Sequence, residues 1–305
     1  MSTEYHRLIL IFVDGVGLAA GTPGNPLAEV ATPEIQRLLG GCLCSEQSCE
    51  TDEVLLRGID ATLGVEGLPQ SATGQAALFT GINAADIMGR HVTGLPGPRI
   101  RTLVESKNLF QMAAAGGLRT TFANAYSASY LDSLAAGRGR PSVTTCAVSS
   151  AGLRFRGLED LESNLAVSWD ILRDRFAEHV ERTLEPITAV QAGRHLAEIA
   201  ERQALTVYET FLTDLAGHGR MGFDAAEAIA RLDGLIGGVL DGRSPTTTVL
   251  VTSDHGNLED SEHRRHTRNP VPLLVVGPLA RCFADVESLL EVTPRILNCL
   301  GVAVT

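Results

Sequence analysis

The chain has 305 residues, 44% of them hydrophobic, and a formal net charge of −11. This length and apolar content fit one large α/β domain, or one such domain with a small cap. The negative charge argues against nucleic acid as the main partner, because phosphate backbones are bound by basic surfaces. Near the N-terminus the apolar run 8–13 ends at Asp14, which is too short for a signal peptide or a membrane span. We therefore expect a cytoplasmic protein that does not bind membranes.

Apolar segments that look like strands alternate with amphipathic segments that look like helices. This pattern is typical of a parallel sheet covered on both faces. The predicted strands are 8–13, 120–124, 206–213, 247–253 and 271–276. The predicted helices are 33–39, 103–115, 189–202, 224–240 and 286–300. We predict an α/β fold, a three-layer α/β/α domain over residues 1–305 with a mostly parallel central sheet, and a small cap within about 83–187.

The segment that follows the predicted strand 247–253 is the most informative part of the chain. The strand ends at Asp254 and His255, and a further histidine, His266, follows in the same loop. A carboxylate and an imidazole at the junction of a buried strand and a loop are typical ligands of a catalytic divalent cation. This segment therefore predicts a metalloenzyme, and further ligands are expected elsewhere in the chain.

Two other strand ends carry the same kind of residue. Asp14 follows the first strand and precedes Gly15, although an aspartate in this position is equally a turn residue. Asp214 and His218 are four positions apart, so one helical turn places them on the same face. Taken alone, that pair is better explained as a helix cap and an unrelated surface histidine. Beside Asp254 and His255, we interpret all of these residues as metal ligands.

A glycine-containing turn with small hydroxyl residues precedes the apolar segment 76–79. It places Ser71 or Thr73 near the start of a helix, where backbone N–H groups favour an anion. The alternative is an ordinary N-cap serine. Two divalent cations would be neutralised by three carboxylates and a serine alkoxide. A cation bound to the Ser71 oxygen would lower the pKa of its hydroxyl and make it a nucleophile for phosphoryl transfer.

Five motifs, in this order, resemble those of the alkaline phosphatase superfamily, and most closely the branch of cofactor-independent phosphoglycerate mutases and phosphopentomutases. They are Asp14-Gly15, Ser71-Ala-Thr-Gly-Gln75, Asp214-x3-His218, Asp254-His255-Gly256 and His266-Thr-Arg-Asn-Pro-Val-Pro272. The resemblance implies one cation held by Asp14, Asp254 and His255 with Ser71, and a second held by Asp214, His218 and His266. It implies Mn²⁺ or Zn²⁺, or else Mg²⁺, and a phosphoryl group carried on Ser71, with Thr73 as the alternative.

The chain departs from that branch in two places. Gln75 stands where those mutases have a histidine, and the segment from 81 to 214 is too short for their large second domain. A mutase must retain its intermediate while the serine is phosphorylated, so these departures favour a phosphatase or phosphodiesterase, and a small cap leaves a phosphomutase open. A sulfatase is disfavoured because neither Cys-x-Pro-x-Arg nor Ser-x-Pro-x-Arg occurs near Ser71.

Several cationic residues are candidates for gripping a small phosphorylated substrate, because guanidinium groups match phosphate oxygens. They are Arg90, His91, Arg99, Arg101, Arg264 and Arg268, and each is equally well explained as a solvated surface residue. A non-catalytic metal- or ligand-binding protein on the same fold is the alternative function. A two-metal peptidase is less favoured, because the Ser71 turn would then have no purpose. The sequence leaves the oligomeric state open.

Cys42, Cys44 and Cys49 form a C-x-C-x4-C cluster. No second cluster at zinc-ribbon spacing occurs, so ordinary reduced thiols are expected there in preference to a structural zinc site.

Overall fold

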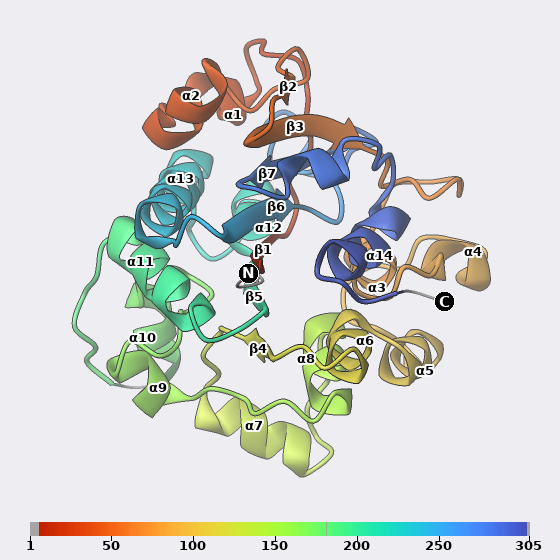
Figure 1. Cartoon of the computed structure of the whole chain (residues 1–305), viewed down its shortest axis with the longest axis vertical. Helices are drawn as coiled ribbons and strands as arrows, with labels where there is room; N and C mark the ends of the chain where they lie inside the picture. The colour runs from red at the N-terminus through yellow and green to blue at the C-terminus, as the bar shows by residue number, and fades with distance from the viewer. Residues whose placement is uncertain (1–5, 181, 304–305) are drawn as a thin grey trace, which may run out of the picture.

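A seven-stranded sheet with the order β2-β3-β7-β6-β1-β5-β4 runs through the middle of this computed structural model (Figure 1). The structure describes residues 6–180 and 182–303. The strands are β1 (Arg7–Val13), β2 (Cys49–Glu50), β3 (Val54–Ile59), β4 (Thr120–Phe122), β5 (Leu205–Thr210), β6 (Thr247–Thr252) and β7 (Val271–Val276).

The central strands of this sheet are parallel. β1 pairs in parallel with β5 and β6, and β4 extends the parallel part beyond β5. On the other side β7 is antiparallel to both β6 and β3, so β3 again runs in the direction of β1. The mixed but mostly parallel sheet confirms the predicted fold class. It also means that β1, β5 and β6 all end at the same edge.

Helices cover both faces of the sheet (Figure 1). They are α1 (Pro26–Glu29), α2 (Pro33–Leu39), α3 (Ser71–Thr80), α4 (Ala84–Met88), α5 (Pro98–Ser106), α6 (Leu109–Ala115), α7 (Ala128–Ala135), α8 (Val143–Ser150), α9 (Leu158–Glu162), α10 (Asp174–Val180), α11 (Ala189–Ala200), α12 (Leu212–Gly217), α13 (Ala225–Gly242) and α14 (Leu289–Cys299), with a short 3₁₀ helix at Ala280–Phe283. No helix in the described ranges has both the length and the apolar character needed to cross a bilayer.

Strand β1 shows how one strand serves two cores. Leu8, Leu10 and Phe12 point into the core beneath α3, α6 and α14, where the rings of Phe12 and Phe79 lie edge to face at 5.9 Å. The alternate side chains, represented by Ile9 and Ile11, point into the second core beneath α2, α11 and α13. Because successive side chains of a strand face opposite sides, an apolar run without alternation is what a sheet buried on both faces requires.

The predicted helix 103–115 is two helices in the structure. Asn108, fully buried, accepts hydrogen bonds from the backbone N–H groups of Phe110 and Gln111, and so caps the start of α6. As the N-cap of α6, Asn108 has extended backbone angles, and α5 therefore cannot continue through it into α6. The strand predicted at 206–213 also ends earlier, at Thr210, and Asp214 lies in α12.

The stretch from 83 to 187 contributes to the main sheet as well as to its surroundings. β4 is an edge strand of the sheet, and α7 lies beyond that edge (Figure 1). Because β4 belongs to the main sheet, only the helices of this stretch could form a cap. The cap remains a prediction.

The cysteine cluster differs from the expectation of reduced thiols. Cys42 and Cys44 form a disulfide, with Cα atoms 5.6 Å apart, and Cys49 is free. This Cα separation lies within the range that a disulfide can span.

Candidate metal centre and adjoining pocket

The predicted ligands meet at the carboxyl edge of the parallel strands. Asp14 directly follows β1, Asp254 and His255 follow β6, and Asp214 lies in α12 just after β5. Gly15 adopts a φ of +77°, and a Cβ atom there would approach the Asp214 side chain to 2.9 Å, so only glycine allows this chain crossing. Ser71 is the first residue of α3 and faces the same edge.

The first cluster surrounds the Nε2 atom of His255. This atom lies 3.1 Å from Asp14 Oδ1, 3.0 Å from Ser71 Oγ and 3.6 Å from Asp254 Oδ2. Asp254 and His255 are fully buried, and Asp14 Oδ1 is buried without a hydrogen bond of good geometry. A buried carboxylate oxygen and an imidazole nitrogen that meet without a hydrogen bond are arranged as two ligands of one cation.

The second cluster consists of Asp214 Oδ1, His218 Nε2 and His266 Nε2. The aspartate oxygen lies 3.4 Å from the His218 nitrogen and 3.6 Å from the His266 nitrogen, and the two nitrogens are 3.2 Å apart. Ligand atoms about 2.1 Å from a tetrahedral ion stand roughly 3.4 Å from one another. The three atoms therefore have the spacing of ligands that share one ion.

The outer nitrogens of the three histidines support the same assignment. Each Nδ1 faces a backbone carbonyl oxygen: that of Arg264 for His218, of Pro69 for His266 and of Gly256 for His255, at 3.0, 2.8 and 3.3 Å. A carbonyl oxygen only accepts, so Nδ1 carries a proton, and Nε2 is the nitrogen through which each ring can present a lone pair to a cation. Two lone pairs facing each other at 3.2 Å repel unless positive charge lies between them. The residues present therefore fit divalent cations.

The acid–base properties of the centre also favour bound positive charge. Burial raises the pKa of Asp254 well above its usual range, and the neighbouring Asp14 raises it further. Burial lowers the pKa of His255, but the carboxyls of Asp254 and Asp14 outweigh this effect and raise it to about 10. For Asp214, burial raises the pKa, and the three histidines around it lower it to about 2.

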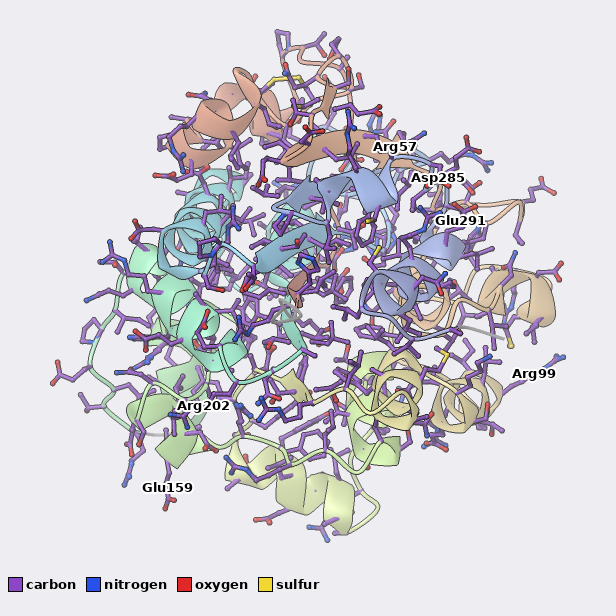
Figure 2. The ribbon with its side chains drawn as sticks, in the orientation of Figure 1. Arg57, Arg99, Glu159, Arg202, Asp285 and Glu291 are labelled. Carbon is purple, nitrogen blue, oxygen red and sulfur yellow. A yellow bond between two sulfur atoms is a disulfide. The ribbon has the colours of Figure 1, made fainter. Side chains whose placement is uncertain are left out.

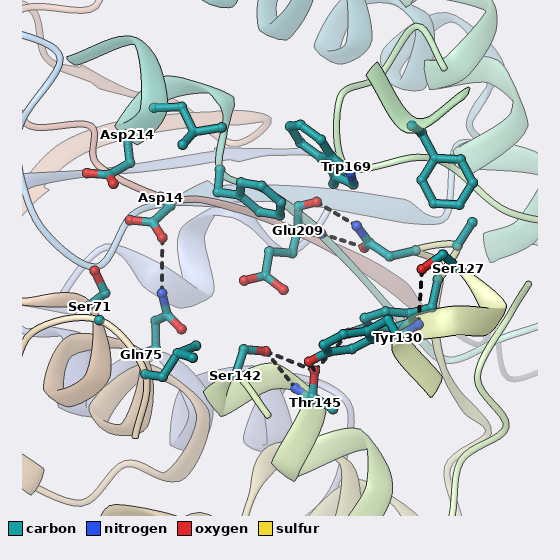
Figure 3. A pocket seen from close by; sticks show the side chains of 18 of the residues that line it. Asp14, Ser71, Gln75, Ser127, Tyr130, Ser142, Thr145, Trp169, Glu209 and Asp214 are labelled. Atoms are coloured by element: carbon teal, nitrogen blue, oxygen red, sulfur yellow. Dashed lines mark hydrogen bonds between the residues drawn. The ribbon is translucent and has the colours of Figure 1, made fainter. Parts of the chain in front are cut away.

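Two residues of the α3 turn hold the first cluster in place. The Gln75 amide donates to Asp14 Oδ2 at 3.2 Å (Figure 3). It also donates to Asp254 Oδ2 at 3.1 Å, and Asp14 Oδ1 is left to face His255. A Cβ atom on Gly74 would lie 2.6 Å from the carbonyl oxygen of Asp254, so the turn can approach this closely only with glycine.

The two hydroxyl candidates of this turn occupy different environments. Thr73 is fully buried; its hydroxyl donates to the Gln70 carbonyl and accepts from the Val92 N–H. Ser71 is the one whose oxygen lies within the metal centre.

Comparisons with known proteins agree with this geometry. The model of the Metalloenzyme superfamily matches residues 188–304. The 2,3-bisphosphoglycerate-independent phosphoglycerate mutase of Chromobacterium violaceum is 39% identical over 131 residues, 40% of this chain and 24% of that protein. The corresponding enzyme of Pseudomonas putida is 31% identical over 129 residues, 39% of this chain and 25% of that protein.

Solved structures extend the similarity of fold over almost the whole chain. Alkaline phosphatase from the Antarctic bacterium TAB5 has a TM-score of 0.58 at 16% identity and covers 98% of this chain and 99% of its own. The PH0037 protein of Pyrococcus horikoshii has a TM-score of 0.57 at 13% identity, over 99% of this chain and 98% of its own. The chain is thus similar to metalloenzymes of the alkaline phosphatase superfamily, in sequence over residues 188–304 and in fold over almost its whole length. It is also similar in sequence to cofactor-independent phosphoglycerate mutases, although the match spans only about a quarter of the length of those curated proteins.

The matched superfamily region contains only part of the centre. Asp214, His218, Asp254, His255 and His266 fall within residues 188–304, whereas Asp14 and Ser71 lie outside them. The assignment of these last two residues therefore rests on their distances to His255 and on the resemblance of their motifs.

One residue that the sequence pattern did not reveal, Glu259, fixes the loops that carry the candidate ligands. The Glu259 carboxylate is only 2% exposed and accepts hydrogen bonds from the N–H groups of Gly17 and Asn257, both at 2.8 Å. It also accepts from the side chains of Thr267 and Asn269. Glu259 thus joins the loop after β1 to the loop that carries His266. Its position in an acidic loop segment gave no sign of burial.

Replacing Glu259 with alanine is expected to lower the free energy of unfolding by about 3 kcal/mol, because several buried donors lose their acceptor. Denaturant unfolding measures this change as a lower midpoint with an unchanged slope. The exposed Glu262 in the same loop provides the control, and its alanine variant is expected to stay within about 0.5 kcal/mol of the wild type. Equal effects of the two substitutions would contradict the role given to Glu259.

A pocket of about 480 Å³ adjoins the metal centre on the side of Asp14, Ser71 and Asp214 (Figure 3). Its walls carry five aromatic side chains: Tyr126, Tyr130, Trp169, Phe176 and Phe211. Glu209 also lines the pocket, and burial, with a contribution from Asp14, raises its pKa to about 8. This residue was missed because it lies within the buried strand β5, where a single carboxylate does not change the apolar pattern.

The residues predicted to bind the substrate do not line this pocket. None of Arg90, His91, Arg99, Arg101, Arg264 and Arg268 is among the residues that line the pocket. Arg99 points outward at the periphery of the molecule (Figure 2). Arg268 donates to the Gly67 carbonyl at 2.7 Å, and His91 faces the Val65 carbonyl at 3.3 Å. A substrate role for these six residues remains a prediction.

Proposed function

We propose that this protein is a two-metal phosphoryl-transfer enzyme that acts on a small phosphorylated metabolite through a phosphoserine at Ser71. The observation that carries the proposal is the position of Ser71 Oγ, 3.0 Å from His255 Nε2, between the metal centre and the pocket. Asp14, Asp254, His255 and Ser71 would hold one divalent cation, and Asp214, His218 and His266 the other. Mn²⁺ or Zn²⁺ suits these oxygen and nitrogen ligands, and Mg²⁺ is a third candidate.

When bound, two divalent cations would offset charge on the phosphoryl oxygens and lower the pKa of the Ser71 hydroxyl. The chain supplies orientation and charge. Gln75 fixes the carboxylates of Asp14 and Asp254, and the start of α3 directs backbone N–H groups toward the anionic phosphoryl group. Ser71 Oγ forms a bond to phosphorus as the ester P–O bond breaks, and the serine proton ends on the departing alcohol. Attack of water on the phosphoserine then releases inorganic phosphate and restores Ser71.

Hydrolysis is the variant that we favour over a mutase reaction. A mutase must return the phosphoryl group to the same organic molecule before water arrives, which requires an enclosed site. The stretch 83–187 supplies β4 and short helices to the main domain, which leaves little chain for a closing domain. The mutases of Chromobacterium violaceum and Pseudomonas putida are about four times as long as the segment matched here.

The metal-loaded protein is expected to release inorganic phosphate from phosphomonoesters faster than it forms any isomer. Phosphate release and isomer formation are measured in parallel on a panel of sugar phosphates, nucleotides, aryl phosphates and phosphoglycerates. Isomer formation without phosphate release would replace the hydrolase by a phosphomutase. Inactivity of both the manganese-loaded and the zinc-loaded protein on the whole panel would favour a non-catalytic metal-binding protein on the same fold.

A further inference from the structure

The pocket beside Ser71 is bounded by two pairs of parallel aromatic rings. The rings of Trp169 and Phe211 are stacked at 4.4 Å with an interplanar angle of 11°, and those of Tyr126 and Tyr130 at 5.4 Å with the same angle. Figure 3 shows Trp169 and Tyr130 on opposite sides of the space in front of Glu209. Flat walls of this kind match a planar group better than a branched or spherical one.

The charges around the pocket disfavour a leaving group with its own negative charge. Among the described residues, neither arginine nor lysine lines it, and the ionisable side chains in its lining other than tyrosine are Asp14, Asp214 and Glu209. The divalent cations would compensate the phosphoryl group. The carboxylate of a phosphoglycerate, in contrast, would lose its hydration in this pocket with no lysine or arginine in the lining to pair with it, which is costly.

Four hydroxyl groups that line the pocket lie close together. Thr145 Oγ1 lies 3.2 Å from both the Tyr126 and Tyr130 hydroxyls and 3.0 Å from Ser142 Oγ. We call these four residues the hydroxyl cluster. Hydroxyl groups both donate and accept, so the cluster can pair with the polar edge of an uncharged ring. The volume of about 480 Å³ exceeds what a phosphorylated three-carbon acid needs and is in the range of pockets for larger organic ligands.

We propose that the pocket binds a phosphoester whose leaving group carries an uncharged planar ring, of the size of a nucleoside. The ring lies between the Trp169–Phe211 pair and the Tyr126–Tyr130 pair, with its polar edge toward the hydroxyl cluster. This inference rests on the proposed phosphoryl transfer at Ser71, because the phosphoryl end of the ligand is placed at the metal centre.

Trp169 allows the ring site to be tested without catalysis, because it is the only tryptophan of the chain. Adenosine, adenosine 5′-monophosphate and ribose 5-phosphate are titrated into the metal-loaded protein, with the fluorescence excited where purines do not absorb. The two ligands with a base are expected to quench Trp169 saturably, and ribose 5-phosphate is expected to leave it unchanged.

Two variants separate stacking from general packing. Tyr130→Leu keeps apolar volume but removes the flat face, and it is expected to weaken adenosine binding about tenfold. The matched control is Phe155→Leu, because the Phe155 ring packs edge-on against Tyr126 at 5.2 Å without lining the pocket. Its adenosine affinity is expected to stay within about threefold of the wild type. Equal weakening by both variants would contradict a stacking site.

Turnover measured on the same proteins distinguishes the inference from the proposed function. The expected kcat/KM is higher for adenosine 5′-monophosphate and phenyl phosphate than for ribose 5-phosphate and 3-phosphoglycerate. Efficient turnover of 3-phosphoglycerate, with no quenching by adenosine, would overturn the ring site and leave phosphoryl transfer intact. Quenching by adenosine that Tyr130→Leu weakens, with no phosphoester turned over, would uphold the ring site and overturn the phosphoryl-transfer function.

Discussion

Replacing Ser71 with alanine is expected to lower phosphoester turnover by on the order of 10⁴- to 10⁶-fold, as the loss of a covalent nucleophile does in other enzymes. The Ser71 oxygen is the hydroxyl oxygen that lies 3.0 Å from His255 Nε2, next to the carboxylates of Asp14 and Asp254. The substitution removes one oxygen from a half-buried position and leaves the remaining ligands in place. The measurement is kcat/KM for the best phosphoester of the panel, with the metal content determined on the same sample.

Thr73→Val is the matched control for this experiment, because it also removes one hydroxyl from the same helical turn. The Thr73 hydroxyl is bonded to the backbone of Gln70 and Val92, so its loss is expected to reduce stability by about 1 kcal/mol and turnover by less than about tenfold. Full turnover by Ser71→Ala together with inactivity of Thr73→Val would assign the nucleophile to Thr73. Full turnover by both variants would contradict the covalent route.

Substitution of the candidate metal ligands is expected to lower both the metal content and the turnover. Wild-type protein loaded with Mn²⁺ or Zn²⁺ and then desalted is expected to retain two ions per chain, one for the cluster around His255 Nε2 and one for the cluster of Asp214, His218 and His266. Asp254→Asn and Asp214→Asn are each expected to retain about one, and their turnover is expected to fall at least about 10³-fold. A chelator is expected to abolish turnover. Metal at about a hundred times its dissociation constant is expected to raise the free energy of unfolding by about 2.7 kcal/mol.

The control for the ligand variants is Asp260→Asn in the same loop. Asp260 lies beside His263 at the surface, outside both clusters, so this variant is expected to retain two ions and full turnover. Elemental analysis gives the ion content, and thermal unfolding with and without chelator gives the stability. A wild-type protein that retains only one ion, with none in either Asp254→Asn or Asp214→Asn, would mean that the two clusters form one site.

That the candidate metal ligands converge could be predicted, because metal chemistry restricts such ligands to a few residue types, and these residues stand at strand ends. Asp14, Asp214 and Asp254 each follow an apolar segment, and parallel strands bring such positions to one edge. The strands and helices that could be predicted are those with a clear apolar pattern or a clear boundary, such as the apolar run of β7 and the proline at the start of α2. β3 was missed because Arg57 and Gly58 interrupt its apolar pattern, and α5 and α6 were merged because the cap at Asn108 depends on its burial.

The pocket could not be predicted from the sequence. Tyr126, Tyr130, Trp169 and Phe211 come from three separate segments, and no local pattern connects them. Glu209 and Glu259 were missed for a related reason, since burial is what distinguishes them from ordinary acidic residues. Sequence reasoning directed the search for substrate contacts to arginines, whereas the structure lines the space beside Ser71 with aromatic rings. Burial and long-range proximity, which no spacing rule encodes, determine this part of the site.

The most direct test of the proposed phosphoserine mechanism is to look for the phosphoryl group on Ser71. Metal-loaded protein is mixed with a phosphoester that it turns over, and the reaction is quenched in acid. The protein is then digested and analysed by mass spectrometry. The account predicts a phosphorylated peptide with the modification on Ser71, present in the wild type and in Thr73→Val and missing from Ser71→Ala. Steady turnover with no phosphorylated residue trapped, or a phosphoryl group found only on another residue, would contradict it.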